Sequence, residues 1–243
     1  MVPALKAGDV VLIGYTIYAI DEKGERVVET TYEDVAKKAG IYDPSKSYGD
    51  LAVVYGRGGL LEAVEEALAV MSPGEVKEVI VPPNRAYGER REDLIVRVPI
   101  KQLERAGVPA RVGAEVEIAG RRGVIARVTE RFAYIDLNHP LAGKTLKIVL
   151  ELKKVVEDPV EKARLLVARA LGLRDDVVKA EVEGGVVRVK LPLVVLNMSD
   201  LDARLRLLIT YVKDSLDPEK LEIVIEAYYK KPEEKPREQE SQS

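Results

Sequence analysis

The first two thirds of the chain alternate short apolar runs with polar turns, a pattern that predicts β-strands. Residues 144–156 alternate most regularly, with leucine and isoleucine on one face and lysine and glutamate on the other. Residues 9–20 are apolar on both faces, which predicts a strand covered on both sides. The strands predicted here are residues 9–20, a short strand from Val27, and residues 51–55, 75–81 and 144–156.

An amphipathic helix is predicted between two of these strands. Its apolar positions recur at helical spacing, and Ser72-Pro73-Gly74 ends it. Those positions are Leu61, Val64, Leu68 and Met71. A shorter helical piece is expected at residues 33–38.

Residues 89–136 show a different pattern of short strands with little helix. The predicted strands are residues 115–118, 123–129 and 132–136, with a short helix at 100–106. Their apolar residues could form either a small exposed sheet face or the core of this segment.

A new unit begins after Val156. Asp158 is predicted to cap a helix whose first residue is Pro159, and Gly172 follows the end of that helix. The turn Glu183-Gly184-Gly185 then predicts a hairpin.

A second helix and a last strand are predicted to complete this unit. Ser199 with Asp202 resembles a capping box that opens the helix, and residues 221–228 form the strand. The apolar face of the helix is predicted from Leu201, Leu205, Leu208, Val212 and Leu216. From Lys230 onward the chain is polar, and we expect a disordered tail.

Composition excludes several kinds of chemistry. The 243 residues contain no cysteine and one histidine, which removes disulfides, thiolate nucleophiles and multi-histidine metal sites, so no metal or cofactor is expected. The formal net charge is −3 with both signs interleaved, so we expect no nucleic-acid or ribosome partner. The amino terminus does not have the pattern of a signal peptide, and no apolar stretch reaches the roughly 18 residues that span a bilayer. We expect a cytoplasmic protein without a membrane partner.

Two local motifs suggest chemistry but are better explained as structure. Gly56-Arg57-Gly58-Gly59 precedes a helix, as phosphate loops do, but it lacks their Gly-Lys-Ser/Thr ending and the helix carries several glutamates. His139 lies in a loop, and the sequence has no nucleophile elbow for which it could act as the catalytic base. We therefore expect it to make local hydrogen bonds.

A series of short motifs, taken in order, resembles the FKBP-type peptidyl-prolyl isomerases. The motifs are Gly8-Asp9-Val10-Val11 with Tyr15, Gly24, Val28-Glu29-Thr30-Thr31, Gly56 with Leu60-Leu61, Glu65-Glu66-Ala67-Leu68 with Met71 and Gly74-Glu75, Pro82-Pro83 with Ala86-Tyr87-Gly88, and Leu141-Ala142-Gly143-Lys144-Thr145-Leu146. The match covers about residues 6–88 and 137–156. Residues 89–136 look like the insert-in-flap domain of the SlyD-type subgroup, and with the carboxyl-terminal unit the chain resembles the long archaeal form.

The resemblance implies an α+β fold with an antiparallel sheet wrapped on a helix. The isomerase domain is expected at residues 1–88 with 137–156, and a β-rich insert-in-flap chaperone domain at 89–136. A carboxyl-terminal α+β domain is expected at 157–229, followed by the tail at 230–243.

The resemblance also implies an enzyme that isomerises X-Pro bonds and holds unfolded chains. Such an enzyme needs a dry apolar pocket rather than a nucleophile, since twisting the imide removes its charge separation. The catalytic residues implied are Tyr15, Glu29 and Tyr87. The substrate-binding residues implied are Val28, Val53, Leu60, Leu61, Val64 and Ile148. The chaperone surface is expected from Val124, Ile125, Val128, Phe132, Tyr134 and Ile135.

Several residues depart from the family pattern. Glu29 stands where an aspartate is usual, and Val28, Val53, Val64 and Ile148 stand where aromatic residues are common. We expect a wider pocket, weak binding of macrolide inhibitors and modest catalysis on short peptides. The alternative is a catalytically weak FKBP-fold module that binds peptides or acts as a chaperone.

The expected partners are unfolded or proline-containing polypeptides. For residues 157–229 we favour a role in substrate cradling or in a homodimer. Binding of the ribosome or of RNA is a weaker option, because acidic residues are interspersed among the arginines of this segment.

Overall fold

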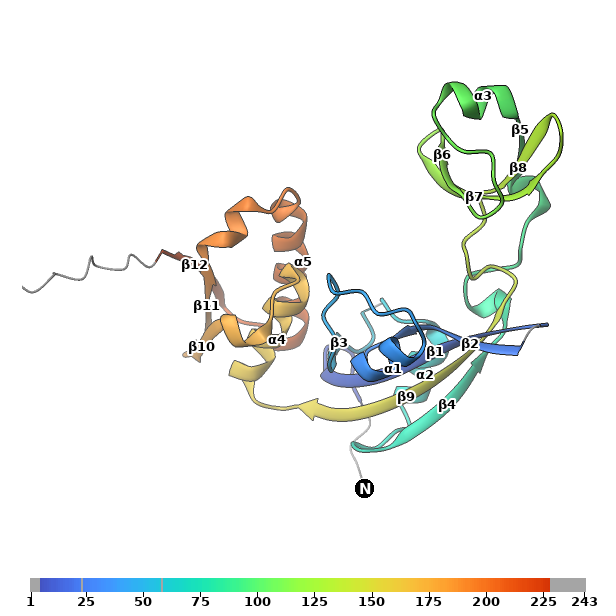
Figure 1. The fold of residues 1–243 in the computed structure, drawn as a ribbon. Helices are drawn as coiled ribbons and strands as arrows, with labels where there is room; N and C mark the ends of the chain where they lie inside the picture. The colour runs from blue at the N-terminus through green and yellow to red at the C-terminus, as the bar shows by residue number, and fades with distance from the viewer. Residues whose placement is uncertain (1–4, 23, 58, 228–243) are drawn as a thin grey trace, which may run out of the picture. The chain divides into compact units, whose positions relative to one another are not determined.

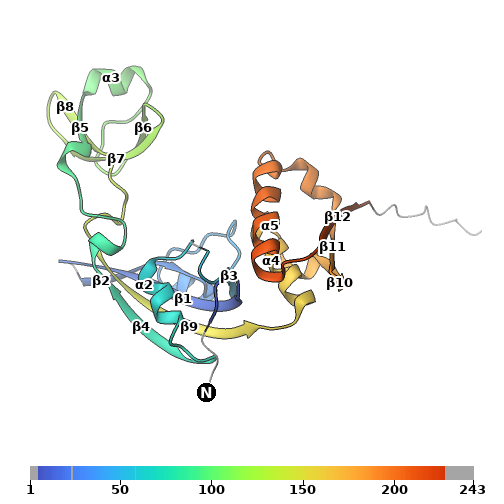
Figure 2. The ribbon, with the colours of Figure 1, turned by 180° about the vertical axis from the view of Figure 1, so that it is seen from behind.

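The computed structural model describes residues 5–22, 24–57 and 59–227. Contacts divide the chain into two compact units, one made mainly of Val11–Leu51 and Tyr55–Val155, the other mainly of the described chain from Val156 onward. Each unit is drawn in Figure 1 and, from behind, in Figure 2. Among the described residues, no helix is long and apolar enough to cross a membrane.

The first unit is built on a five-stranded sheet in the order β2-β1-β9-β4, with β3 paired to β1. Its strands are β1 (Val10–Asp21), β2 (Gly24–Thr30), β3 (Leu51–Val54), β4 (Val76–Val81) and β9 (Thr145–Val156). The alternation predicted for the last of these is confirmed, since the leucine and isoleucine face of β9 is fully buried. That face is Leu146, Ile148, Leu150 and Leu152. β2 begins three residues earlier than Val27 because the turn before it is tight, with Gly24 in the left-handed region at φ 105°.

Two short α-helices accompany this sheet. α1 (Glu33–Lys38) lies where a helical piece was predicted. α2 (Glu62–Leu68) buries Ala63, Val64, Ala67 and Leu68. The predicted helix was too long, because Leu61 is the residue that precedes the first turn and the helix ends before Met71.

A four-stranded sheet is inserted between β4 and β9, in the order β5-β8-β7-β6. Its elements are β5 (Ile95–Pro99), α3 (Ile100–Arg105), β6 (Glu115–Ile118), β7 (Arg121–Val128) and β8 (Phe132–Asp136), preceded by the 3-10 turns η1 (Pro83–Arg85) and η2 (Glu92–Leu94). Its core consists of Leu103, Ala114, Val116, Ile125, Ala133 and Ile135. We call residues 89–136 the inserted module. The sequence did not predict β5, an edge strand of five residues.

The second unit packs two helices against a three-stranded sheet (Figure 1, Figure 2). Its elements are α4 (Pro159–Leu171), η3 (Asp175–Val177), β10 (Lys179–Glu183), β11 (Val186–Pro192), η4 (Leu193–Asn197), α5 (Leu201–Leu216) and β12 (Lys220–Glu226). β10 and β11 form the predicted antiparallel hairpin, and β12 lies parallel to β11. Gly184 and Gly185 both have positive φ, as a two-residue turn of this kind requires.

Both ends of α4 have the caps that the sequence predicts. The Asp158 carboxylate accepts hydrogen bonds from the backbone N–H groups of Val160 and Glu161, and Gly172 closes α4 at φ 66°, so both predictions are confirmed.

The prediction of a capping box at Ser199 is wrong. Asp200 precedes α5 without a side-chain cap, because its carboxylate instead accepts a hydrogen bond from Arg204 Nε at 2.8 Å. Of the predicted apolar face of α5, Leu208 and Val212 are buried and the rest are half-buried. The predicted end of the last strand at Tyr228 and the predicted tail lie outside the described residues.

Candidate functional site

Tyr15 and Glu29 meet across the pairing of β1 with β2. The Tyr15 hydroxyl donates to Glu29 Oε1 at 2.5 Å. The backbone of Tyr15 is fixed by the threonines that follow Glu29: its N–H donates to Thr31 Oγ1 at 3.0 Å, and its carbonyl accepts from Thr30 Oγ1 at 3.0 Å. The carboxylate of Glu29 is therefore anchored on a rigid strand pair.

Tyr87 lies just beyond η1, in an irregular segment. Pro83 carbonyl oxygen accepts the N–H groups of Ala86 at 3.0 Å and Gly88 at 2.8 Å, which turns the chain tightly. The Tyr87 side chain is 37% exposed. Burial raises the pKa of Tyr87, and the negative charge of Glu29 raises it further. Tyr87 is thus within electrostatic range of the Tyr15–Glu29 pair.

Arg85 ties the same turn to α2. Its guanidinium lies 2.8 Å from the carboxylate of Glu66 and 3.4 Å from that of Glu62. These groups are exposed, so each pair contributes little stability.

The apolar residues predicted to bind substrate fall into two groups by burial. Val53, Val64 and Ile148 are buried, while Val28, Leu60 and Leu61 are half-buried. Leu61 also precedes the first turn of α2. The half-buried side chains are available for contact with a bound molecule, whereas the buried ones pack in the interior.

The six residues predicted for the chaperone surface do not share one face. Ile125 and Ile135 are fully buried in the core of the inserted module, and Val128 packs partly against that core. Phe132 and Tyr134 alternate with Ala133 and Ile135 along β8, so they point to the other side of the sheet. Val124 is exposed.

Arginines cover both outward aromatic rings of β8. The Arg97 guanidinium lies 4.5 Å from the ring centre of Phe132, and that of Arg127 lies 3.9 Å from the ring centre of Tyr134. Both distances are typical of cation–π contacts. We call this side of the sheet, with Phe132, Tyr134, Arg97 and Arg127, the outer face of the module.

His139 is the residue near the site that sequence reasoning missed. The local hydrogen bond expected for it is present, since Nδ1 accepts the N–H of Leu141 at 3.2 Å. Its ring also stacks on Tyr87, with centroids 4.1 Å apart. No local pattern could reveal this contact, because the inserted module separates the two residues in sequence.

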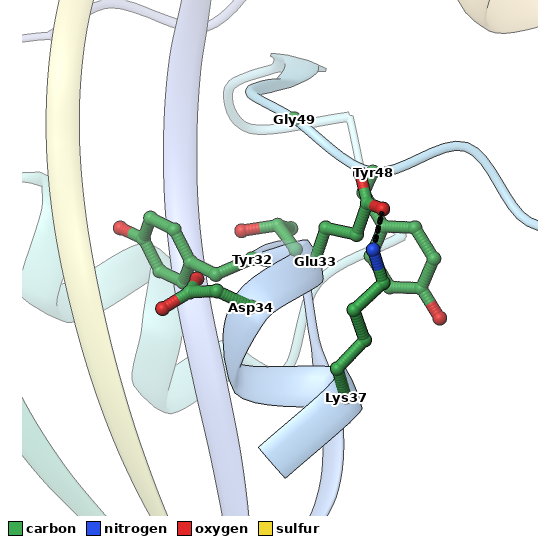
Figure 3. Close-up of a pocket in the computed structure, with 7 residues that line it drawn as sticks. Tyr32, Glu33, Asp34, Lys37, Tyr48 and Gly49 are labelled. Atoms are coloured by element: carbon green, nitrogen blue, oxygen red, sulfur yellow. Dashed lines mark ion pairs between the residues drawn. The ribbon is translucent and has the colours of Figure 1, made fainter. Parts of the chain in front are cut away.

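A surface hollow lies beside α1 (Figure 3). Its lining is Thr31, Tyr32, Glu33, Asp34, Lys37, Tyr48 and Gly49. Burial, followed by the hydrogen bond that Tyr32 donates to Glu151 at 2.6 Å, raises the pKa of Tyr32 to about 12. None of the predicted site residues lines this hollow, although Thr31 in its lining accepts the backbone N–H of Tyr15.

No metal centre is evident in the part of the chain that the structure describes, where histidine, aspartate and glutamate form no group of three or more suited to an ion.

Comparisons with known proteins identify the family. The family model described as FKBP-type peptidyl-prolyl cis-trans isomerase matches residues 3–104. A short-type peptidyl-prolyl cis-trans isomerase of Methanocaldococcus jannaschii is 36% identical over 155 residues, which are 64% of this chain and 96% of that protein. This chain belongs to the FKBP-type peptidyl-prolyl cis-trans isomerases.

Bacterial members of the family named SlyD are also similar to it. The SlyD isomerase of Treponema pallidum is 36% identical over 138 residues, 55% of this chain and 77% of that protein. The SlyD isomerase of Escherichia coli is 30% identical over 134 residues, 54% of this chain and 68% of that protein. The FKBP-type relationship therefore includes the SlyD proteins, and like other members of the family this isomerase acts on proline-containing polypeptides.

The electrostatic link between Glu29 and Tyr87 can be measured. In Glu29→Gln the negative charge is gone, so we expect the pKa of Tyr87 to fall toward its ordinary value, while the contribution of burial remains. The measurement is an NMR titration of the Tyr87 ring carbons, with the resonance assigned by comparison with Tyr87→Phe. Glu33→Gln, which removes a carboxylate from α1, should leave the titration unchanged. An unaltered Tyr87 titration in Glu29→Gln would contradict the proximity of the two groups.

Proposed function

We propose that this FKBP-type isomerase binds an X-Pro segment at Tyr15, Glu29 and Tyr87, against the half-buried side chains of Val28, Leu60 and Leu61. Val53, Val64 and Ile148 would form the apolar base behind them. The observation that carries the proposal is the cluster of two tyrosines and one carboxylate, in which Tyr15 donates to Glu29 and Glu29 acts electrostatically on Tyr87. The Tyr87 hydroxyl would donate to a substrate carbonyl, and the backbone N–H of Leu61 would hold a second carbonyl.

The chemistry needs no covalent step. A planar X-Pro imide resists rotation with a barrier of about 20 kcal/mol, because resonance gives its C–N bond partial double-bond character. Twisting the bond removes the resonance and the charge separation across the imide. Apolar surroundings therefore favour the twisted state over the planar one, and a few hydrogen bonds fix the orientation of the chain.

Glu29 has a supporting role in this proposal. It accepts the Tyr15 hydroxyl and, through its charge, raises the pKa of Tyr87. The raised pKa favours the protonated form of the Tyr87 hydroxyl, the form that can donate to a substrate. Catalysis on short peptides is expected to be modest, because valine and isoleucine replace aromatic residues that commonly wall this pocket in the family.

We further propose that the inserted module holds unfolded chains on its outer face. The support is the pair of arginine-covered aromatic rings there, which combine apolar area with hydrogen-bond donors. Holding a chain beside the pocket would raise the concentration of its X-Pro bonds at Tyr87.

The domain division belongs to the same proposal: residues 1–88 with 137–156 as the isomerase domain, 89–136 as the chaperone domain and 157–229 as a third domain. Each of the three has its own sheet. We propose homodimerisation for the third domain, supported by Leu193, Val194 and Leu196 of η4, all at least half exposed. A cytoplasmic location stays a prediction.

The isomerase site is tested with Tyr87→Phe. Removing one hydrogen bond to the substrate should lower kcat/KM for an X-Pro tetrapeptide about three- to tenfold, with the peptide affinity largely kept. NMR exchange spectroscopy measures the rate, and calorimetry the affinity. Tyr42→Phe removes the hydroxyl of a similarly exposed tyrosine in the connection between β2 and β3, and should change neither value. An unchanged rate in Tyr87→Phe would favour the alternative, a catalytically weak peptide-binding module.

The chaperone function is tested on the outer face. In the double variant Phe132→Ser, Tyr134→Ser, we expect suppression of client aggregation to be lost and proline-limited refolding to slow about tenfold, because the local concentration of client falls. Turnover of the tetrapeptide should be unaffected. Val112→Ser alters an exposed valine of the same module away from β8 and serves as the control. Undiminished refolding activity in the double variant would count against the outer face.

The dimer is tested by light scattering on the full chain. Val194→Glu with Leu196→Glu puts charge on the exposed apolar residues of η4, so we expect the dimer mass to fall to that of a monomer. Val177→Glu, at another exposed valine of this unit, should leave the dimer intact. A monomeric unmodified chain rules the dimer out.

A further inference from the structure

The ring of His139 lies flat on the ring of Tyr87. The ring centroids are 4.1 Å apart and the planes differ by 5°. Stacked rings at this separation gain dispersion energy from their many close atom pairs, and moving either ring away loses it. His139 therefore restricts the orientation of the side chain on which the proposed site depends.

His139 is itself held by the loop that follows it. Its Nδ1 accepts the N–H of Leu141 at 3.2 Å, and its carbonyl oxygen accepts the N–H of Ala142 at 2.9 Å. The loop between β8 and β9, residues 137–144, which we call the return loop, thus sets the orientation of the imidazole.

The return loop is fastened to the chain just after Tyr87. Gly143 N–H donates to the carbonyl of Gly88 at 2.8 Å. Asn138 makes a two-way bond with the backbone of Arg91: its Oδ1 accepts the N–H and its Nδ2 donates to the carbonyl, both at 2.9 Å. These hydrogen bonds lie on both sides of His139, so the return loop and the segment after Tyr87 are held together around the stacked rings.

The segment that carries Tyr87 is irregular, although hydrogen bonds to the Pro83 carbonyl fix its backbone turn. η1 ends at Arg85, and Ala86 has φ −115° and ψ −109°, outside the favoured regions. Gly88 then takes a left-handed conformation at φ 80°. Tyr87 is in neither a helix nor a strand, so its side chain depends on contacts from elsewhere.

We propose that His139 is a positioning residue for the isomerase reaction, and that its stacking holds the Tyr87 hydroxyl where it can donate to the substrate carbonyl. The inference rests on the role proposed for Tyr87. His139 touches no reacting atom, and acts only through the tyrosine. The return from the inserted module thereby completes the site.

Three variants of the full chain separate the stack from the hydrogen bond. His139→Ala removes both, and kcat/KM for an X-Pro tetrapeptide should fall about two- to tenfold. His139→Phe keeps a flat ring but loses the Nδ1 acceptor, and should recover most of the rate. His139→Asn keeps an acceptor for the Leu141 N–H but has no ring, and should be as slow as His139→Ala. The Tyr87 ring resonances should shift in the alanine and asparagine variants as the imidazole ring current is lost.

A double-mutant cycle shows whether His139 acts through the hydroxyl of Tyr87. In the Tyr87→Phe background the hydroxyl is absent, so His139→Ala should slow the enzyme less than about twofold further. Tyr42→Ala removes a stacked pair of similar exposure, Tyr42 on Tyr48, and should leave kcat/KM unchanged.

Different results identify what has failed. If Tyr87→Phe leaves the rate unchanged, the proposed role of Tyr87 fails. If Tyr87→Phe slows the enzyme while His139→Ala does not, this inference alone is overturned. A phenylalanine variant as slow as the alanine variant also overturns it, because the stack would then contribute nothing.

Discussion

The five-stranded sheet of the first unit depends on the burial of one face of β9. Leu146, Ile148, Leu150 and Leu152 are fully buried, and β9 lies between β1 and β4 in the sheet. Val81 at the end of β4 is the direct partner of Leu146 at the start of β9. The chain therefore leaves the sheet at the end of β4 and returns to it, after the inserted module, at the same end of the β4–β9 pair.

This pairing has two consequences. Bringing the two ends of an inserted segment together costs conformational entropy. Here the pairing of β4 with β9 already holds the ends of the inserted module together. It also brings the outgoing segment with Tyr87 beside the returning segment with His139. Their stacking, and the Gly143–Gly88 hydrogen bond, follow from where the two strands begin and end.

The sequence predicts those parts of the fold whose cause is local. The alternation along β9 and the Asp158-Pro159 to Gly172 frame of α4 are set by neighbouring residues, and both predictions hold. Ser199 failed as a cap because Asp200 precedes α5 instead and pairs with Arg204, a competition that spacing alone does not resolve. β5 was not predicted because it is only five residues long, contains Arg97 at its centre and ends in a proline. Such a sequence gives a weak signal even for an edge strand.

In the candidate site, too, local features could be predicted from the sequence and non-local contacts could not. Tyr15, Glu29 and Tyr87 could be named from their motifs, whereas the contact of His139 with Tyr87 is non-local and has no motif. In β8, apolar or aromatic residues occupy both faces, so the pattern could not say that Ile135 points to the core while Phe132 and Tyr134 point outward.

The outer face of the module, which we propose to hold unfolded chains, would have to meet two opposing requirements. A surface that holds unfolded chains must offer apolar area, yet exposed aromatic rings on a sheet favour association between copies. Arg97 over Phe132 and Arg127 over Tyr134 shield those rings with a charged but flat group. A guanidinium is weakly hydrated and can slide aside or stack on an arriving side chain, whereas a neighbouring copy presents the same positive charges and is repelled. In the proposed function, the same pairs that cover the rings would therefore favour a client chain over a second copy at this face.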